Sequence, residues 1–167
     1  MLFKEDVSAA MLLEQVSHLS RYHAMKKMEA MGIKPGQAGI LFILNSEESM
    51  SQKELAKKMG ITPPSMTAAV KKLETRGYIV KEPDTSDQRA FKIGLSDKGR
   101  ECVENLKDIM EEIEETVFKG ITHDEKLFFK RLLFEMRKNL TDNKELRGLD
   151  ICSIMEKTRP PMAPEMK

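Results

Sequence analysis

The fold of this chain is decided by residues 51–77, SQKELAKKMGITPPSMTAAVKKLETRG. Ser51 and Glu54 have the spacing of a capping box, in which each side chain satisfies a free amide at the start of a helix. Gly60 predicts a turn after this short helix, and Thr62 followed by two prolines predicts the start of a second helix. This order of elements is a helix-turn-helix. The second helix should turn three apolar residues inward: Met66, Val70 and Leu73.

A β-hairpin is expected directly after the two helices. Residues 78–81 alternate like a strand, residues 82–88 form a polar loop, and residues 89–95 are again rich in β-forming residues. A helix-turn-helix followed by such a wing can place one helix in the major groove of DNA and a basic loop against the minor groove. Tight helix pairs also occur for packing reasons alone, so the pattern by itself leaves a purely structural role open. Three basic side chains flank the hairpin: Lys81, Arg89 and Lys92.

Further helices are expected on both sides of this unit, which makes the fold class mainly α with a small β-hairpin wing. Apolar spacing predicts a long helix over residues 4–31 and a second, largely buried helix over residues 37–45. Ser96 should cap a helix to about residue 119, and Thr122 opens a second capping box and a helix to about residue 140. These last two helices carry apolar stripes, made by Val103, Leu106, Met110, Ile113 and Val117 and by Leu127, Phe128, Leu132, Leu133 and Met136.

Length and composition indicate one domain of ordinary size. The chain has 167 residues, of which 40% are hydrophobic and 33% charged, the composition of a soluble globular protein. Its longest apolar run, residues 38–44, is far shorter than the roughly 20 residues that cross a bilayer. We therefore expect a cytoplasmic protein with no membrane partner.

The net charge of +1 conceals a strong local asymmetry. Residues 51–100 carry 11 basic and 6 acidic residues, a net charge of +5, and residues 101–124 carry 2 basic and 8 acidic residues, a net charge of −6. Affinity for DNA depends on the phosphates that a protein touches, so the local excess matters more than the total. A solvated helix face would explain the same charges, and the pattern leaves both interpretations open.

Three motifs around the hairpin are similar to those of the MarR family of transcriptional regulators. They are LETRGYIV at residues 73–80, DTSDQR at residues 84–89 and LSDKG at residues 95–99. The resemblance in element order extends from about residue 5 to residue 141. It implies a sequence-specific DNA-binding transcriptional regulator, expected to be a repressor, that binds a pseudo-palindromic operator as a homodimer.

The resemblance also implies how a single domain, residues 1–167, is organised. Residues 35–96 would form the winged helix-turn-helix lobe that binds DNA. Residues 1–34 and 97–141 would form the N- and C-terminal dimerisation helices. Residues 142–167 would be a C-terminal tail extension beyond the family pattern, with a short helix around residues 146–156.

Base reading is expected from the face of the second helix opposite its buried residues. Many family members have arginine where this chain has Ala68, so guanine reading is absent there and contact with thymine methyl groups is expected instead. An A·T-rich operator follows from this difference. The predicted contacts of this helix are Thr62, Pro64, Ser65, Thr67, Ala68, Lys71 and Lys72, and the predicted phosphate contacts are Lys53 and Lys57, with Lys72 and Lys92 as further candidates.

The wing is expected to reach the minor groove through Arg89, with Asp87 fixing the geometry of its guanidinium and Lys92 nearby. A salt bridge within the hairpin that never meets DNA is the alternative role of Arg89. Family wings often have proline where this chain has Thr85 and arginine where it has Gln88. These two departures leave the wing less rigid and less charged.

The resemblance further implies a small aromatic or lipophilic effector, bound between the dimerisation helices and the winged lobe. The candidate pocket residues are His18, Tyr22, Met25 and Phe42. The first three lie on one helical face, and packing within the core or the dimer is the favoured explanation of that face.

No catalytic, cofactor or metal site is expected in this sequence. His18 and His23 lie about 140° apart round a helix, and the glycines do not cluster as a phosphate-binding loop requires. Cys102 is expected to be a small buried hydrophobe rather than a redox sensor. We therefore expect no enzyme activity, and the rival function is a winged-helix protein-interaction module that does not bind DNA.

Overall fold

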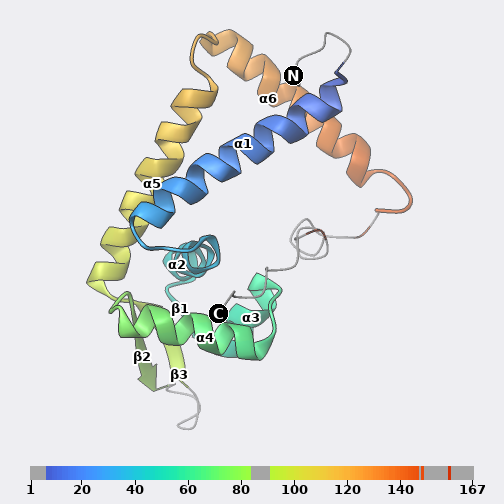
Figure 1. The fold of residues 1–167 in the computed structure, drawn as a ribbon. Helices are drawn as coiled ribbons and strands as arrows, with labels where there is room; N and C mark the ends of the chain where they lie inside the picture. Colours follow the sequence, from blue (N-terminus) through green and yellow to red (C-terminus); the bar gives the residue numbers. More distant parts are fainter. Residues whose placement is uncertain (1–6, 84–90, 147, 149–157, 159–167) are drawn as a thin grey trace.

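Figure 1 shows the computed structural model of the chain, in which residues 7–83, 91–146, 148 and 158 are described. Its elements follow in the order α1 (Ala9–Ala30), α2 (Pro35–Glu47), β1 (Ser49–Ser51), α3 (Gln52–Met59), α4 (Pro63–Thr75), β2 (Ile79–Pro83), β3 (Phe91–Leu95), α5 (Asp97–Val117) and α6 (His123–Thr141). Helices α2 to α4 and the sheet form a compact unit, and α1 and α5 lead away from it towards α6 (Figure 1). The predicted fold class, mainly α with a small hairpin wing, is confirmed.

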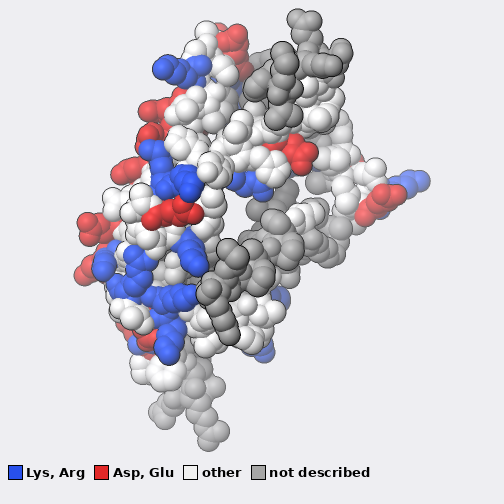
Figure 2. All heavy atoms as spheres, in the orientation of Figure 1, with Lys and Arg blue, Asp and Glu red and all other residues white. Residues whose placement is uncertain are grey.

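Charged side chains are unevenly placed on this fold (Figure 2). Acidic side chains line the edge formed by α5, and lysine and arginine side chains gather over the part of the molecule where α4 crosses the view (Figures 1 and 2). The basic and acidic stretches that follow one another in the sequence therefore also lie on different parts of the folded chain.

The wing belongs to a three-stranded antiparallel sheet in the order β1-β3-β2. β2 and β3 form the predicted hairpin, with Lys81 opposite Ile93. The strand β1 was not expected from the sequence, and it pairs with the other edge of β3, where Met50 lies opposite Ile93. Because Ser51 is both the last residue of β1 and the N-cap of α3, this pairing ties the start of α3 to the wing. The predicted start of the second hairpin strand, residue 89, lies outside the described residues.

Local capping hydrogen bonds set the starts of the later helices. The four predicted N-caps are confirmed: the side chains of Ser51, Thr62, Ser96 and Thr122 each accept a hydrogen bond from an amide three residues later. The glutamates of both predicted capping boxes accept the return hydrogen bond at 2.8 Å. These caps satisfy amides that a helix leaves free at its first turn.

Two predicted helix bounds were wrong. Helix α1 begins at Ala9 rather than at residue 4, because Ser8 has an extended backbone and its hydroxyl accepts a hydrogen bond from the Met11 amide at 3.2 Å. Helix α2 covers Pro35–Glu47 rather than residues 37–45, and its earlier start is favoured because proline at the first helical position needs no amide partner. Local backbone chemistry therefore outweighed apolar spacing at both positions.

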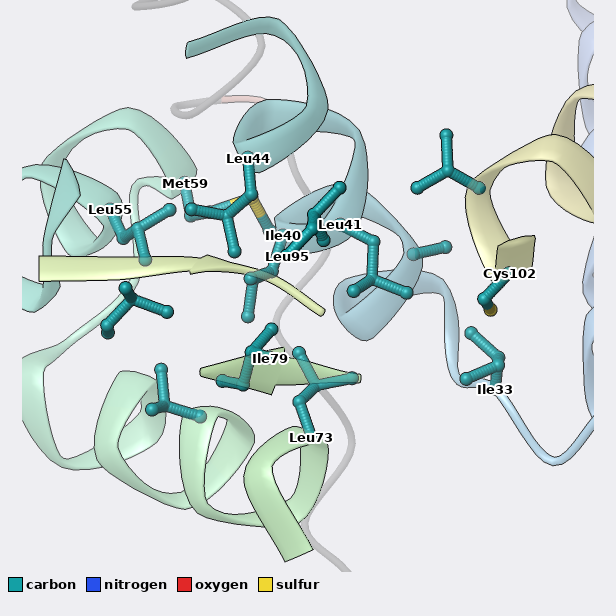
Figure 3. Close-up of a cluster of buried hydrophobic side chains, with 14 of the residues drawn as sticks. Ile33, Ile40, Leu41, Leu44, Leu55, Met59, Leu73, Ile79, Leu95 and Cys102 are labelled. Atoms are coloured by element: carbon teal, nitrogen blue, oxygen red, sulfur yellow. The ribbon is translucent and has the colours of Figure 1, made fainter. Parts of the chain in front are cut away.

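The hydrophobic core surrounds α2 (Figure 3). Ile40, Leu41 and Leu44 of this helix are at most 1% exposed, and the three apolar residues of α4 that were predicted to face inward are equally buried. Cys102 of α5 is also buried, as expected, and burial raises the pKa of its thiol. The core thus fixes one face of α4 and leaves the opposite face in solvent.

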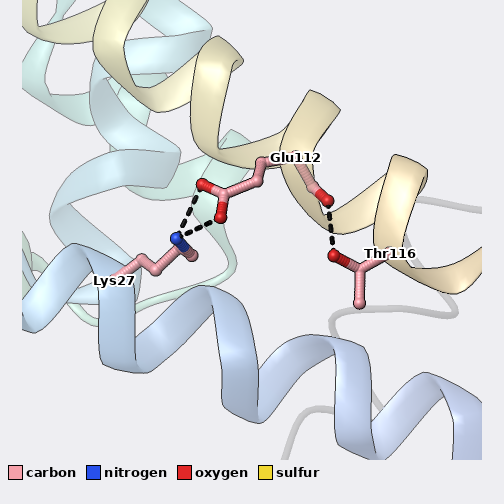
Figure 4. Close-up of polar contacts among 3 residues, drawn as sticks. All are labelled: Lys27, Glu112 and Thr116. Atoms are coloured by element: carbon pink, nitrogen blue, oxygen red, sulfur yellow. Dashed lines mark hydrogen bonds and ion pairs between the residues drawn. The ribbon is translucent and has the colours of Figure 1, made fainter.

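An ion pair joins the two long helices α1 and α5 (Figure 4). The ammonium nitrogen of Lys27 lies 2.6 Å from both carboxylate oxygens of Glu112, 85 residues away in the sequence. On α5, the stripe residues Val103, Leu106 and Ile113 are buried, whereas α6 has no buried residue. Of the apolar stripe predicted on α6, Leu132 and Leu133 are half-buried, and Leu127, Phe128 and Met136 are exposed in a single chain.

Candidate nucleic-acid interface

The exposed face of α4 carries the residues that were predicted to read DNA. Because Met66, Val70 and Leu73 pack into the core, helical geometry turns the intervening side chains outward. Ser65 is half-buried, and the other predicted residues are exposed: Thr62, Pro64, Thr67, Ala68, Lys71 and Lys72. The structure therefore brings the predicted recognition set together on one surface.

A hydrogen bond joins this surface to the start of α3. The Nε2 of Gln52 donates to the Thr67 hydroxyl oxygen at 2.7 Å, and the same hydroxyl donates to the Pro63 carbonyl at 2.9 Å. Gln52 was not among the predicted site residues, because nothing in its spacing from Thr67 distinguishes this pair from other polar pairs. Its position directly after the N-cap Ser51 is the one signal in the sequence that it lies at an exposed helix end.

Two hollows flank α4. The first, about 890 Å³, lies at the turn between α3 and α4 and is lined by Gln52, Lys53, Ala56, Lys57, Gly60, Ile61, Thr62 and Pro63. It brings the predicted phosphate contacts Lys53 and Lys57 beside the first residues of α4. The second, about 620 Å³, lies towards the other end of α4 and is lined by Gly32, Lys34, Gln37, Ala68, Lys71, Lys72, Thr75 and Arg76.

Lys34 is a second residue that the sequence did not indicate. It lies in the loop before α2, and only the folding of α2 against the core brings it to the hollow beside Lys71 and Lys72. The recognition surface is thus edged by lysines on both sides, an arrangement suited to the two phosphate backbones that border a groove.

The C-terminal end of α4 is held by Arg76. Its guanidinium donates to the backbone carbonyls of Gly32 and Met31, the latter at 3.3 Å, and lies 5.1 Å from the centre of the Tyr78 ring. The backbone carbonyl of Arg76 in turn accepts from the Lys98 ammonium at 2.8 Å. One residue therefore connects the end of α4 with the loop after α1 and with the start of α5.

The wing is described only at its base. An ion pair of 2.7 Å joins Lys81 of β2 to Glu74 of α4, and Lys92 lies half-buried on β3. The predicted minor-groove residues Asp87 and Arg89 lie outside the described residues, so their roles stay predictions.

The four residues predicted to line an effector pocket lie on α1 and α2. His18 and Tyr22 are exposed on α1, Met25 and Phe42 are half-buried, and none of the four lines either hollow beside α4. A third hollow, about 270 Å³, lies between α1 and α5 and is lined by other residues: Val16, Leu19, Ser20, His23, Ile113, Thr116 and Val117.

The described part of the chain shows neither a metal-binding cluster nor a membrane-spanning helix. No group of three histidine, cysteine, aspartate or glutamate side chains in that part is placed to hold a metal ion. In the same residues, no helix has both the length and the apolar character needed to cross a membrane.

The sequence and the structure were compared with known proteins. The model of the MarR family matches residues 33–91. The chain is 30% identical over 105 residues to the HTH-type transcriptional regulator YybA of Bacillus subtilis (strain 168), which covers 63% of this chain and 70% of that protein. It is 26% identical over 133 residues to the HTH-type transcriptional regulator YdgJ of the same organism. That alignment covers 80% of this chain and 81% of YdgJ.

Solved structures of MepR from Staphylococcus aureus are similar over most of the chain. One MepR mutant has a TM-score of 0.76 and 26% sequence identity, covering 80% of this chain and 99% of MepR. Another mutant, bound to an oligodeoxyribonucleotide, has a TM-score of 0.65 and 26% identity, covering 81% and 99%. The similarity thus includes a relative captured on DNA.

Proposed function

This chain belongs to the MarR family of winged helix-turn-helix transcriptional regulators, and we propose that it represses transcription by binding a pseudo-palindromic operator as a homodimer. The observation that carries the proposal is the exposed face of α4, which is polar and basic, edged by lysines and backed by a rigid core. A helix presented in this way can enter the major groove while the flanking lysines contact phosphates.

Uncovered apolar side chains support the homodimer. Leu19 of α1, Phe128 of α6 and Leu140 of α6 are 68%, 57% and 61% exposed in a single chain. A second copy of α1, α5 and α6 related by a two-fold axis would cover such side chains and remove them from water. Two α4 helices would then face two half-sites about one helical turn apart.

Side-chain chemistry on α4 supports an A·T-rich operator. Ala68 and the methyl group of Thr67 are apolar, and both suit contact with the C5-methyl group of thymine. Lys71 follows Thr67 and Ala68 by one helical turn on this face, and it lines the same hollow as Lys34 and Lys72. Neither Ala68 nor Thr67 offers the bidentate donors that read guanine.

We also propose that a small aromatic or lipophilic molecule releases the dimer from DNA. We assign this ligand to His18, Tyr22 and the half-buried Met25 of α1 and to the half-buried Phe42 of α2, because methionine adapts readily to apolar ligands. A ligand bound there would lower DNA affinity if it favoured a different spacing of the two lobes.

Selection of bound duplexes from a random DNA library, followed by titration at several salt concentrations, tests the DNA-binding proposal. We expect A·T-rich half-sites with two-fold symmetry and an affinity that falls steeply with salt. Binding that does not depend on salt, or a library that yields no enriched sequence, would instead favour the protein-interaction module. Selection of G·C-rich half-sites would contradict the base contacts assigned to Thr67 and Ala68.

A further inference from the structure

The Thr67 hydroxyl has its hydrogen-bonding capacity largely used within the protein. A hydroxyl has one hydrogen to donate, and Thr67 donates it to the Pro63 carbonyl at 2.9 Å, one turn earlier in α4. Its oxygen accepts from Gln52 at 2.7 Å. Thr67 therefore cannot donate to a base, and its fixed side chain presents its methyl group instead.

The two hydrogen bonds of the Thr67 hydroxyl also fix the orientation of the Gln52 amide. Because the Thr67 hydrogen is committed to a carbonyl, the Thr67 oxygen needs a donor, so the NH₂ group of Gln52 and not its oxygen must face it. An NH₂ group has two hydrogens. Among the described residues the Gln52 side chain makes this one hydrogen bond, which leaves its second N–H available.

The surroundings of Gln52 suit a phosphate. Gln52 lines the hollow at the α3–α4 turn together with Lys53 and Lys57, both exposed. In a helix-turn-helix the first helix crosses the DNA backbone while the second lies in the groove. A phosphate that approaches α3 would thus come to the edge of the hollow where the free amide hydrogen and two ammonium groups lie.

We propose that Gln52 is a further DNA-contacting residue, whose amide bridges one phosphate of each half-site and the Thr67 hydroxyl. This inference rests on the proposed DNA binding and adds a coupling to it. Because one NH₂ group would bind both the phosphate and the Thr67 hydroxyl, the position of the DNA backbone sets the position of the Thr67 methyl group against its thymine. Backbone contact and base reading are then linked through two residues that are 15 apart in the sequence.

The test uses the full-length dimer and a selected operator in which each phosphate in turn is replaced by a neutral methylphosphonate. Wild-type protein should lose about tenfold in affinity at one phosphate per half-site, the effect of losing a hydrogen bond to a charged group. Gln52→Ala removes this contact in both half-sites, so it should bind the unmodified operator about a hundredfold more weakly and show no further loss at that phosphate. Asn45→Ala, which removes an exposed amide from α2, should behave as wild type.

Thr67→Val tests the coupling, because valine keeps the methyl group and removes only the hydroxyl. It should weaken binding, and the double variant with Gln52→Ala should be no weaker than Gln52→Ala alone. Purely additive losses, an unchanged affinity of Gln52→Ala, or full methylphosphonate sensitivity in Gln52→Ala would each overturn the inference. Failure of the wild-type protein to bind any selected duplex would overturn the proposed function itself, which is a separate outcome. Thermal denaturation of each variant checks that lost affinity does not reflect unfolding.

Discussion

Gly99 lies directly against Tyr78: a Cβ atom at position 99 would be 2.0 Å from the Tyr78 carbonyl oxygen and 3.0 Å from the carbonyl carbon. The same oxygen accepts a hydrogen bond from the Ser96 amide at 3.1 Å. The first turn of α5 therefore packs against Tyr78, the residue just before β2. This contact joins the helix that leaves the winged unit to the segment that follows α4.

Replacement of Gly99 by alanine should therefore destabilise the protein. The methyl group meets backbone atoms that cannot move independently, so α5 must shift, and overpacking of this kind costs about 1–3 kcal/mol or more. Gly36→Ala is the matched control, since no atom lies within 4 Å of its added Cβ and its backbone is helical. Urea denaturation of both variants at equal protein concentration compares them, and equal stability of the two would contradict the contact.

Arg76→Ala should loosen the end of α4. The change removes donors to the Gly32 and Met31 carbonyls and the contact with the Tyr78 ring, with an expected loss of about 1–3 kcal/mol in unfolding free energy. Arg100→Ala is a suitable comparison, because Arg100 is exposed and its ion pair spans 3.9 Å. If calorimetry gave the same melting temperature for both variants, Arg76 would not hold the helix end.

The ion pair between Lys27 and Glu112 predicts a pH dependence. A hydrogen bond from Lys27 lowers the pKa of the Glu112 carboxyl below its ordinary value of 4.5. A lowered pKa in the folded state stabilises the protein above pH 4.5, and this contribution is lost as the pH falls through the folded-state pKa. Wild type should exceed Glu112→Gln in stability at neutral pH, and the two should converge in acid. Glu111→Gln is the control on the same helix. Denaturation curves measured across the pH range should show no such pH-dependent difference between this variant and wild type.

Phe128→Glu should weaken the proposed dimer. Phe128 is 57% exposed in one chain, and a carboxylate in an apolar interface is left unpaired and desolvated, so dimer dissociation should increase at least about tenfold. Lys130→Gln changes a charge about 200° round the same helix and should leave the dimer intact. Sedimentation over a range of concentrations distinguishes them, and a monomeric wild type would rule out the assignment of this face.

Ala68→Arg should change which bases are selected. Arginine supplies the two parallel donors that read guanine in the major groove, and Ala68 is exposed on the recognition face. Selection with the variant should enrich G at one position of each half-site where wild type selects A·T pairs. An unchanged selected sequence would place Ala68 away from the bases.

Most helix starts were predictable because they depend on residues within one turn of each other. The hydroxyls of Ser51, Thr62, Ser96 and Thr122 accept from amides three residues ahead, so their effect is visible in the sequence. The start of α1 was missed because apolar spacing continued past Ser8, whose cap overrides it. The strand β1 was missed because three residues carry no pattern, and the residues of β3 that pair with it lie more than 40 residues further along the chain.

The candidate interface likewise has features that the sequence predicts and features that only tertiary packing sets. The outward face of α4 followed from its buried residues by helical geometry, and the motifs after it indicated the family, so both could be predicted from the sequence alone. Only the tertiary structure placed Lys34 beside Lys71, Gln52 on Thr67 and Arg76 on the loop after α1. These contacts join elements whose separation is set by packing around the core, and no rule of local spacing encodes the distance between two helices.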